Sequence, residues 1–105
     1  MTDGPIMPDS KLGEKLGFTN DLFDGYLFIR GNEIYISAII SRKKGQGNLS
    51  KLFNKIEEEG YKIAVPGPMD HMKMILLKKG FLPTMENCHP KHGIDKIDVW
   101  RKQYA

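Results

Sequence analysis

Residues 34–59 read IYISAIISRKKGQGNLSKLFNKIEEE, and this stretch decides the fold expected for the whole chain. Its first part is rich in β-branched residues and predicts a strand, and its last part carries apolar residues at helical spacing. Between them lies the loop RKKGQG, residues 42–47, whose glycines allow a ligand to approach the backbone closely. The first N–H groups of the following helix lack partners inside it, and the helix dipole favours a negative ligand there. This order of elements predicts a phosphate-binding turn.

The helix after the loop has a one-sided apolar stripe at positions i, i+3, i+4 and i+7, formed by Leu49, Leu52, Phe53 and Ile56. Asn48 or Ser50 is expected to cap its first turn with a side-chain oxygen. Gly60 follows three glutamates and is expected to end the helix.

The strand before the loop is predicted to run from Glu33 to about Ser41 and to form a hairpin with residues 26–30, YLFIR. Gly31 and Asn32 suit a type II′ turn, which needs glycine at its first central position. Alternation along the strand places two sets of residues on opposite faces, Ile34, Ile36, Ala38 and Ile40 against Tyr35, Ser37 and Ile39. Because both faces carry apolar residues, we expect a central strand covered on both sides.

After the helix, residues 61–65 (YKIAV) predict a strand parallel to 33–41, joined to it by a right-handed βαβ crossover. A second helix is expected over 69–79, with Met72, Ile75 and Leu76 facing inward. A short strand is then expected to start at Phe81 and Leu82, followed by a polar, turn-like segment over 86–93 and a final strand over 94–100. Residues 1–25 are rich in glycine and proline, and they predict an irregular lead-in with at most a short helix after Asp9 and Ser10. The prediction is one α/β (α+β) domain over residues 1–105 with a mixed sheet and helices on both faces.

Bulk properties narrow the class of protein. The chain has 105 residues, 40% hydrophobic and 28% charged, with no apolar run long enough for a membrane span and no secretory signal at its start. Without such a run or signal, we expect no membrane partner. The single cysteine excludes an internal disulfide and indicates a cytoplasmic protein. The net charge of +3 suits an anionic ligand but is too small to argue for nucleic acid by itself.

The loop Arg42-Lys43-Lys44-Gly45-Gln46-Gly47 resembles the R/Q-x-x-G-x-G/A pyrophosphate loop of the GNAT N-acetyltransferase superfamily. The order of the surrounding elements is also similar to the C-terminal half of that family, and Gly80-Phe81 resembles the glycine–phenylalanine pair that follows its last helix. The resemblance covers residues 26–101, and it implies a GNAT-like fold.

The resemblance implies that acetyl-CoA is the co-substrate and that its acetyl group passes to an amine, on a small molecule or a protein, by direct attack on the thioester. The pantetheine arm would then run along Ile39, Ile40 and Ser41. The phosphates would be surrounded by Arg42, Lys43, Lys44, Gly45, Gln46, Gly47 and Asn48. Glu33 stands near the position of the catalytic base in some members, and Tyr35 or Tyr26 is a candidate proton donor.

Other parts of the family pattern are missing. Leu76 occupies the place where many members carry the tyrosine that protonates the leaving thiolate, and Met69 stands where an asparagine often begins the second helix. One alternative is therefore a degenerate module of the same family, of the kind a phage can encode. Such a module binds or inhibits without catalysis. A small basic nucleic-acid-binding domain is a second one, although the loop lacks interleaved aromatic residues.

The segment 88–92, CHPKH, contains three side chains that can bind a soft metal ion, one cysteine and two histidines, and His71 is the remaining histidine of the chain. A structural zinc site needs about four ligands in tetrahedral reach, so this segment supplies too few. We expect no metal site, and the sequence leaves the acceptor amine and the oligomeric state open.

Overall fold

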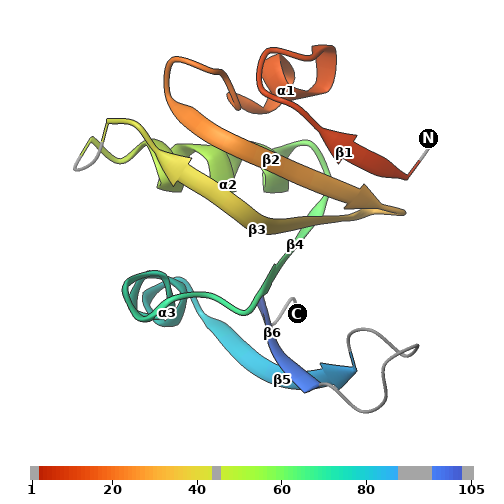
Figure 1. Cartoon of the computed structure of the whole chain (residues 1–105), viewed down its shortest axis with the longest axis vertical. Helices are drawn as coiled ribbons and strands as arrows, with labels where there is room; N and C mark the ends of the chain where they lie inside the picture. Colours follow the sequence, from red (N-terminus) through yellow and green to blue (C-terminus); the bar gives the residue numbers. More distant parts are fainter. Residues whose placement is uncertain (1–2, 44–45, 88–95, 103–105) are drawn as a thin grey trace. The chain divides into compact units, whose positions relative to one another are not determined.

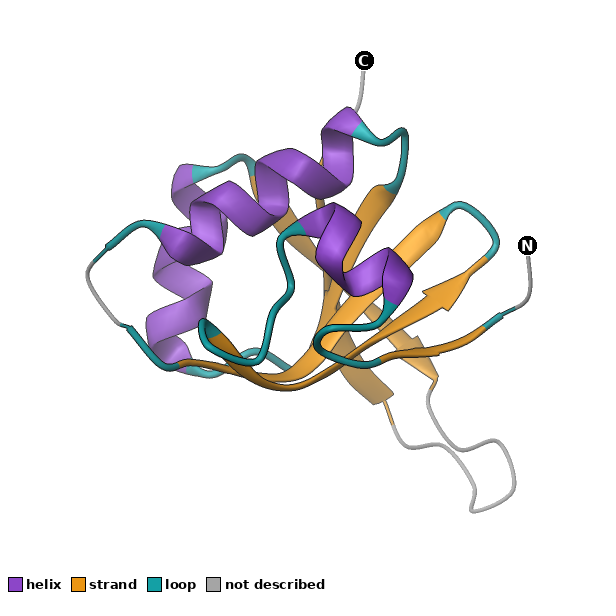
Figure 2. Ribbon diagram, turned by 90° about the horizontal axis from the view of Figure 1, so that it is seen from above, coloured by secondary structure: helices purple, strands orange, loops and turns teal. Residues whose placement is uncertain are grey.

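The computed structural model describes residues 3–43, 46–87 and 96–102 and has an α+β fold, with helices and mostly antiparallel strands (Figures 1 and 2). The chain divides into two compact units, Met1–Ile63 and Ala64–Ala105, and the strand β4 (Lys62–Pro66) contains the boundary. The expected α+β class is confirmed. In the described part of the chain, no helix is both long and apolar enough to cross a membrane.

The first unit contains three antiparallel strands in the order β1-β2-β3 (Figure 1). These are β1 (Gly4–Ile6), β2 (Phe23–Arg30) and β3 (Glu33–Ser41). The predicted hairpin is confirmed, with Gly31 at φ 62° in its turn, although β2 begins earlier than expected. Lys62, at the start of β4, donates its N–H to the carbonyl of Asn32 at 2.8 Å.

A β-bulge interrupts the pairing of β2 with β3. Tyr26 pairs with Ala38 but Leu27 pairs with Ile36, so Ser37 is an extra residue on β3. A bulge shifts the alternation of side chains by one position. Ile34 and Ile36 are buried as expected, but Ile40 is 62% exposed. The prediction that Ile40 shares their face is therefore wrong, because the bulge lies between them.

Two helices cover the buried face of this sheet (Figure 2). The helix α2 (Asn48–Glu58) follows the predicted bounds closely, and its inward stripe of Leu52, Phe53 and Ile56 is buried. The helix α1 (Lys11–Leu16) contacts α2, and Lys15 pairs with Glu59 at 3.2 Å. The core of this unit also takes up Ile6, Leu16, Phe18, Phe23, Leu27, Ile29 and Ile63.

The lead-in is more regular than its composition indicates. Ser10 caps α1 by accepting a hydrogen bond from the N–H of Gly13 at 3.1 Å. A Cβ at Gly13 would lie 2.6 Å from the carbonyl oxygen of Met7, so this glycine allows the helix to pack closely rather than only weakening it. Phe18 is fully buried, and β1, which the sequence did not predict, adds a strand beside β2.

The second unit contains α3 (Asp70–Lys78), β5 (Phe81–Asn87) and β6 (Lys96–Lys102), with β6 antiparallel to both β4 and β5. The strand β5 begins at Phe81 as predicted and continues through Glu86 and Asn87, which were expected to belong to a turn, and Pro83 lies within it. In α3 only Leu76 is fully buried, whereas Met72 and Ile75 are half-buried. The indole Nε1 of Trp100 donates to the Asp98 carboxylate at 2.8 Å.

Candidate phosphate-binding loop

The candidate site lies between the end of β3 at Ser41 and the start of α2 at Asn48. Gly47 is the N-cap of α2, in the left-handed conformation with φ 72° and ψ 15°, and no side chain caps the helix. The prediction that Asn48 or Ser50 is the N-cap is therefore wrong. A Cβ at Gly47 would meet no atom of the described residues within 4 Å. Among these residues, none covers this side of the helix start.

Asn48 is held inside the loop rather than facing a ligand. Its side chain is buried, with 9% exposure, and its Nδ2 donates a long hydrogen bond of 3.5 Å to the carbonyl of Lys43. This bond joins the first residue of α2 to the beginning of the loop. Asn48 therefore shapes the loop, while its main-chain N–H belongs to the open first turn.

Arg42 is anchored to the segment before β2 and to β2 itself. Its main-chain N–H donates to the Leu22 carbonyl at 2.7 Å, and its guanidinium reaches the Phe23 carbonyl and the Asn20 side chain, each at 3.4 Å. The guanidinium also pairs with Asp24 at 3.5 Å. Arg42, predicted among the phosphate ligands, is thus a residue that fixes the base of the loop.

Lys43 faces an acidic neighbour. A hydrogen bond from the Thr19 side chain holds the pKa of the Asp21 carboxyl below its ordinary value, and the charge of Lys43 lowers it further. Asp21 and Asp24 therefore offset part of the positive charge at the loop. Gln46 and Gly47 are exposed, whereas Lys44 and Gly45 lie outside the described residues.

The residues expected along the pantetheine arm occupy the last part of β3. Ile39 and Ser41 are half-buried, and they pair with Gly25 and Phe23 of β2. Ile40 lies on the opposite, exposed face beside Asp24. Since alternate strand residues point to opposite faces, a ligand on one face of β3 contacts only part of this predicted set.

The candidate catalytic residues lie at the other end of β3. Glu33 is its first residue and pairs with Arg30, and the Arg30 guanidinium lies 5.9 Å from the centre of the Tyr35 ring. At about 3.3 Å per residue, roughly 26 Å separates Glu33 from Ser41. The structure therefore does not bring these residues next to the loop. Tyr26 is 42% exposed, and Leu76 is fully buried in the second unit.

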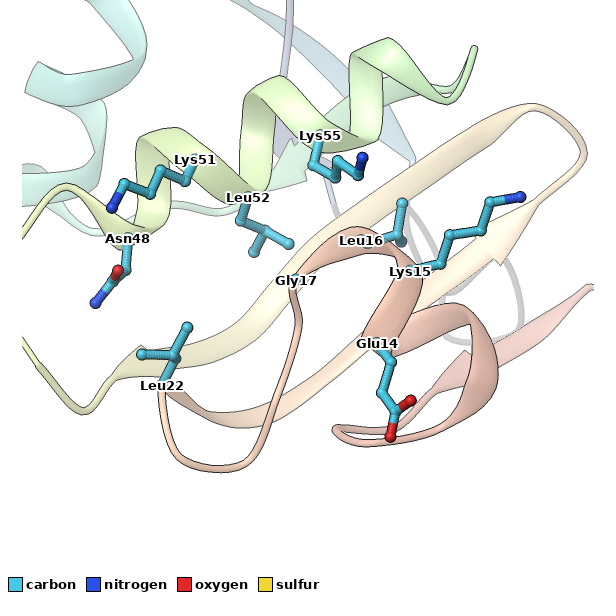
Figure 3. Close-up of a pocket in the computed structure, with 9 residues that line it drawn as sticks. All are labelled: Glu14, Lys15, Leu16, Gly17, Leu22, Asn48, Lys51, Leu52 and Lys55. Carbon is cyan, nitrogen blue, oxygen red and sulfur yellow. The ribbon is translucent and has the colours of Figure 1, made fainter.

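A groove of about 290 Å³ runs between α1 and α2 and shares Asn48 with the loop (Figure 3). Three leucines, Leu16, Leu22 and Leu52, form its apolar part, and Figure 3 shows Lys51 and Lys55 on α2 above it. Sequence reasoning missed this groove. The spacing of Lys51 and Lys55, four residues apart beside the loop, is the signal that indicates a basic helix face.

The candidate soft ligands Cys88, His89 and His92 lie outside the described residues, and His71 is exposed in the first turn of α3. Among the residues that are described, no three histidine, cysteine, aspartate or glutamate side chains gather closely enough to hold a metal ion.

Comparison of the chain with protein-family models, curated proteins and solved structures finds no match. The resemblance to the acetyltransferase loop therefore rests on the residues and the order of the elements.

Proposed function

We propose that this chain binds acetyl-CoA at the loop between β3 and α2 and transfers the acetyl group to an amine. One observation carries the proposal. Gly47 begins α2 in a left-handed conformation without a side-chain cap hydrogen bond, which leaves the first N–H groups of the helix without a capping side chain and suited to a diphosphate.

The charges on α2 support an anionic ligand at this end. The first turn has no acidic residue and ends at Lys51, whereas the last turn carries two acidic residues, Glu57 and Glu58, and one basic residue, Lys55. This arrangement opposes the helix dipole, which favours acidic groups at the N-terminus and basic groups at the C-terminus. A bound phosphate at the N-terminus would offset that cost.

The geometry of β3 supports a ligand that extends from the loop along the strand. The bond from Lys62 to Asn32 places the start of β4 beside the start of β3, as a parallel βαβ unit requires. The bulge at Ser37 leaves this residue without a partner on β2. We assign to this region the acyl end of the ligand, between the loop and the candidate residues Glu33 and Tyr35.

The transfer itself needs few groups. The amine nitrogen attacks the thioester carbonyl carbon, the carbon–sulfur bond breaks, and the proton lost by the amine is taken by a base while the thiolate gains one. Glu33 is the candidate base and Tyr35 the candidate acid. Main-chain N–H groups near a bulge are suited to hold the oxyanion that develops on the carbonyl oxygen.

Thermal unfolding in the presence of acetyl-CoA tests the binding step. A ligand at a hundred times its dissociation constant adds about 2.7 kcal/mol to the free energy of unfolding. We expect stabilisation of the wild type and none of Gly47→Trp, whose indole fills the open side of the helix start. An absence of stabilisation of the wild type at millimolar acetyl-CoA would refute the proposal.

Gly60→Trp is the matched control. Gly60 follows the other end of α2 at φ 91°, and a Cβ there would also meet no atom within 4 Å, so both variants carry similar backbone strain. Gly60→Trp should still be stabilised by acetyl-CoA. If both variants lose the stabilisation equally, the loop is not the binding site.

A degenerate binding module is the alternative that the structure favours next. Leu76 is fully buried where the family's acid would stand, and Glu33 lies at the hairpin end of β3. Release of free thiol from acetyl-CoA, measured with a panel of primary amines, distinguishes the transferase from the non-catalytic module. If acetyl-CoA stabilises the protein but no amine causes thiol release, the non-catalytic module is the correct function and the transferase is not.

A further inference from the structure

We infer that the outer face of the sheet β1-β2-β3, the face opposite α1 and α2, binds single-stranded nucleic acid by stacking its bases on aromatic rings. The rings belong to Tyr26 and Phe28 of β2 and to Tyr35 of β3. These three side chains are called the aromatic platform below. The inference does not rest on the proposed function, because it concerns a different ligand and is tested without acetyl-CoA.

The three rings share one face of the sheet. Leu27 and Ile29 belong to the buried core, so alternation along β2 directs Tyr26 and Phe28 to the opposite side. Tyr35 stands directly across from Phe28 in the strand pairing, and such neighbours point to the same face with their Cβ atoms about 5 Å apart. At about 3.3 Å per residue, Tyr26 precedes Phe28 by roughly 7 Å along the strand. The rings therefore form one group and are not scattered over the surface.

The aromatic platform is accessible to a ligand. In Figure 1 the strands β2 and β3 lie in front of α2, and Figure 2 shows the helices of this unit together on one side of the strands. On the other side, Tyr26 is 42% exposed, and Ile40 at the end of the same face is 62% exposed. Phe28 and Tyr35, which stand opposite each other, are half-buried and keep part of their surface in contact with water. All three rings thus offer surface to a base.

Unpaired bases suit such a surface. Some RNA-binding domains use an antiparallel sheet in this way and stack two or three bases on the aromatic side chains of its open face. Because every base has a π-face, stacking on a ring does not require a particular sequence. It does require a single strand, since the bases of a duplex are already stacked on each other. The ligand expected here is therefore a single strand of any sequence.

Cations complementary to a phosphate chain lie at both ends of the aromatic platform. Arg30, at one end, is exposed, and its guanidinium lies 5.9 Å from the centre of the Tyr35 ring. From this position it can contact the phosphate of a base that stacks on the ring, or extend the stack with its own plane. At the other end β3 leads into the basic loop, whose Lys43 is exposed.

Two acidic residues lie on the same face, and each stands beside an arginine. Asp24 pairs with Arg42 at 3.5 Å, and Glu33 stands opposite Arg30 in the strand pairing. These carboxylates reduce the positive charge that phosphates meet. We therefore expect stacking to supply most of the affinity and the dependence of binding on salt to be shallow.

Fluorescence anisotropy of a labelled single-stranded DNA oligonucleotide tests the assignment. We expect the wild type to bind the single strand more tightly than the duplex of the same sequence. Phe28→Leu keeps the apolar bulk but removes the ring, and it should weaken binding about fivefold or more. Phe28→Tyr keeps a ring and should bind like the wild type. Tyr26→Leu changes a side chain outside the core and should weaken binding to a similar extent.

Leu77→Ala is the matched control for the loss of exposed apolar surface. Leu77 is 55% exposed on α3, outside the aromatic platform, and this variant should bind as tightly as the wild type. Thermal unfolding checks that each variant is folded under the conditions of the assay.

Three results would overturn the assignment. They are a wild type that binds no single strand at low ionic strength, equal affinity for single strand and duplex, and wild-type affinity in both Phe28→Leu and Tyr26→Leu. A loss of affinity in Leu77→Ala as large as in these two variants would also show that the platform is not the site. Because acetyl-CoA is absent from the assay, each proposal can fail without the other.

Discussion

The side-chain amide of Asn48 donates to the main-chain carbonyl of Lys43 at 3.5 Å and so ties the first residue of α2 to the start of the basic loop. Asn48 is the only polar residue that is buried among those the structure describes. A buried polar side chain is costly unless it is hydrogen-bonded. The shape of the loop therefore depends on this side chain.

Asn48→Ala removes the bond and leaves the Lys43 carbonyl without this donor. We expect a loss of about 1 kcal/mol in the free energy of unfolding and faster tryptic cleavage after Lys43. Asn54→Ala, at an exposed position of the same helix, is the control and should be neutral or slightly stabilising. Urea unfolding and limited proteolysis measure both. Unchanged cleavage in Asn48→Ala would show that the side chain does not hold the loop.

Ser50→Glu is expected to affect stability and binding in opposite directions. A glutamate in the first turn of α2 interacts favourably with the helix dipole and should stabilise the fold by about 0.3–1 kcal/mol. The same charge repels a diphosphate at the helix start, so the affinity for acetyl-CoA should fall. Ser50→Gln keeps the size without the charge. A glutamate variant that binds acetyl-CoA as well as the glutamine variant would contradict an anion site here.

Because of the bulge at Ser37, Ile36 is buried whereas Ile40 on the same strand is exposed, so the two positions should tolerate a polar side chain differently. Ile36→Thr places a hydroxyl in the core, where Ile36 is 2% exposed, and should cost about 1–3 kcal/mol. Ile40→Thr changes a side chain that is 62% exposed and should stay within about 0.5 kcal/mol of the wild type. Thermal unfolding compares them. Equal destabilisation would indicate an unbroken alternation and no bulge.

Asp98 should make the stability of the protein depend on pH in the acid range. The hydrogen bond from Trp100 lowers the pKa of its carboxyl below the ordinary value of 3.8. Because the folded pKa is below the unfolded one, the stabilisation is complete above about pH 3.8 and is lost as the pH falls through the folded value. Asp98→Asn should therefore be less stable than the wild type at pH 7, with the difference shrinking at lower pH.

The fluorescence of Trp100, the only tryptophan in the chain, measures this unfolding directly. A stability difference between the wild type and Asp98→Asn that is the same at pH 7 and pH 3 would mean that Asp98 is not the titrating group.

The elements that were predicted correctly are those specified by residues close together in the sequence. The apolar stripe predicted α2 and the glycine turn predicted the β2–β3 hairpin, and both the helix and the hairpin are confirmed. The bulge at Ser37 was not predictable, because it depends on how β2 and β3 align and not on the sequence of either. The strand β1 is only three residues long and contains Pro5, so it lacks the usual signature of a strand.

The site was predictable in position but not in detail. The basic residues and glycines located the loop, but the partners of Arg42 come from residues about twenty positions earlier in the chain. The groove joins α1 to α2, and nothing in the sequence of α2 alone shows which segment packs beside it. Tertiary contacts of this kind decide which charges face a ligand.

The short strand β1 also bears on how copies of this chain meet each other. It is an edge strand of the sheet, and its Pro5 has no N–H that could pair with a further strand. The Asp3 carboxylate, which accepts from the N–H of Gly31 at 2.8 Å, holds it in place. Without these residues the part of β2 that pairs with β1, Leu27–Ile29, would become a free edge with an aromatic residue at its centre. We therefore expect the lead-in to oppose edge-to-edge aggregation at these three residues, a task separate from any ligand.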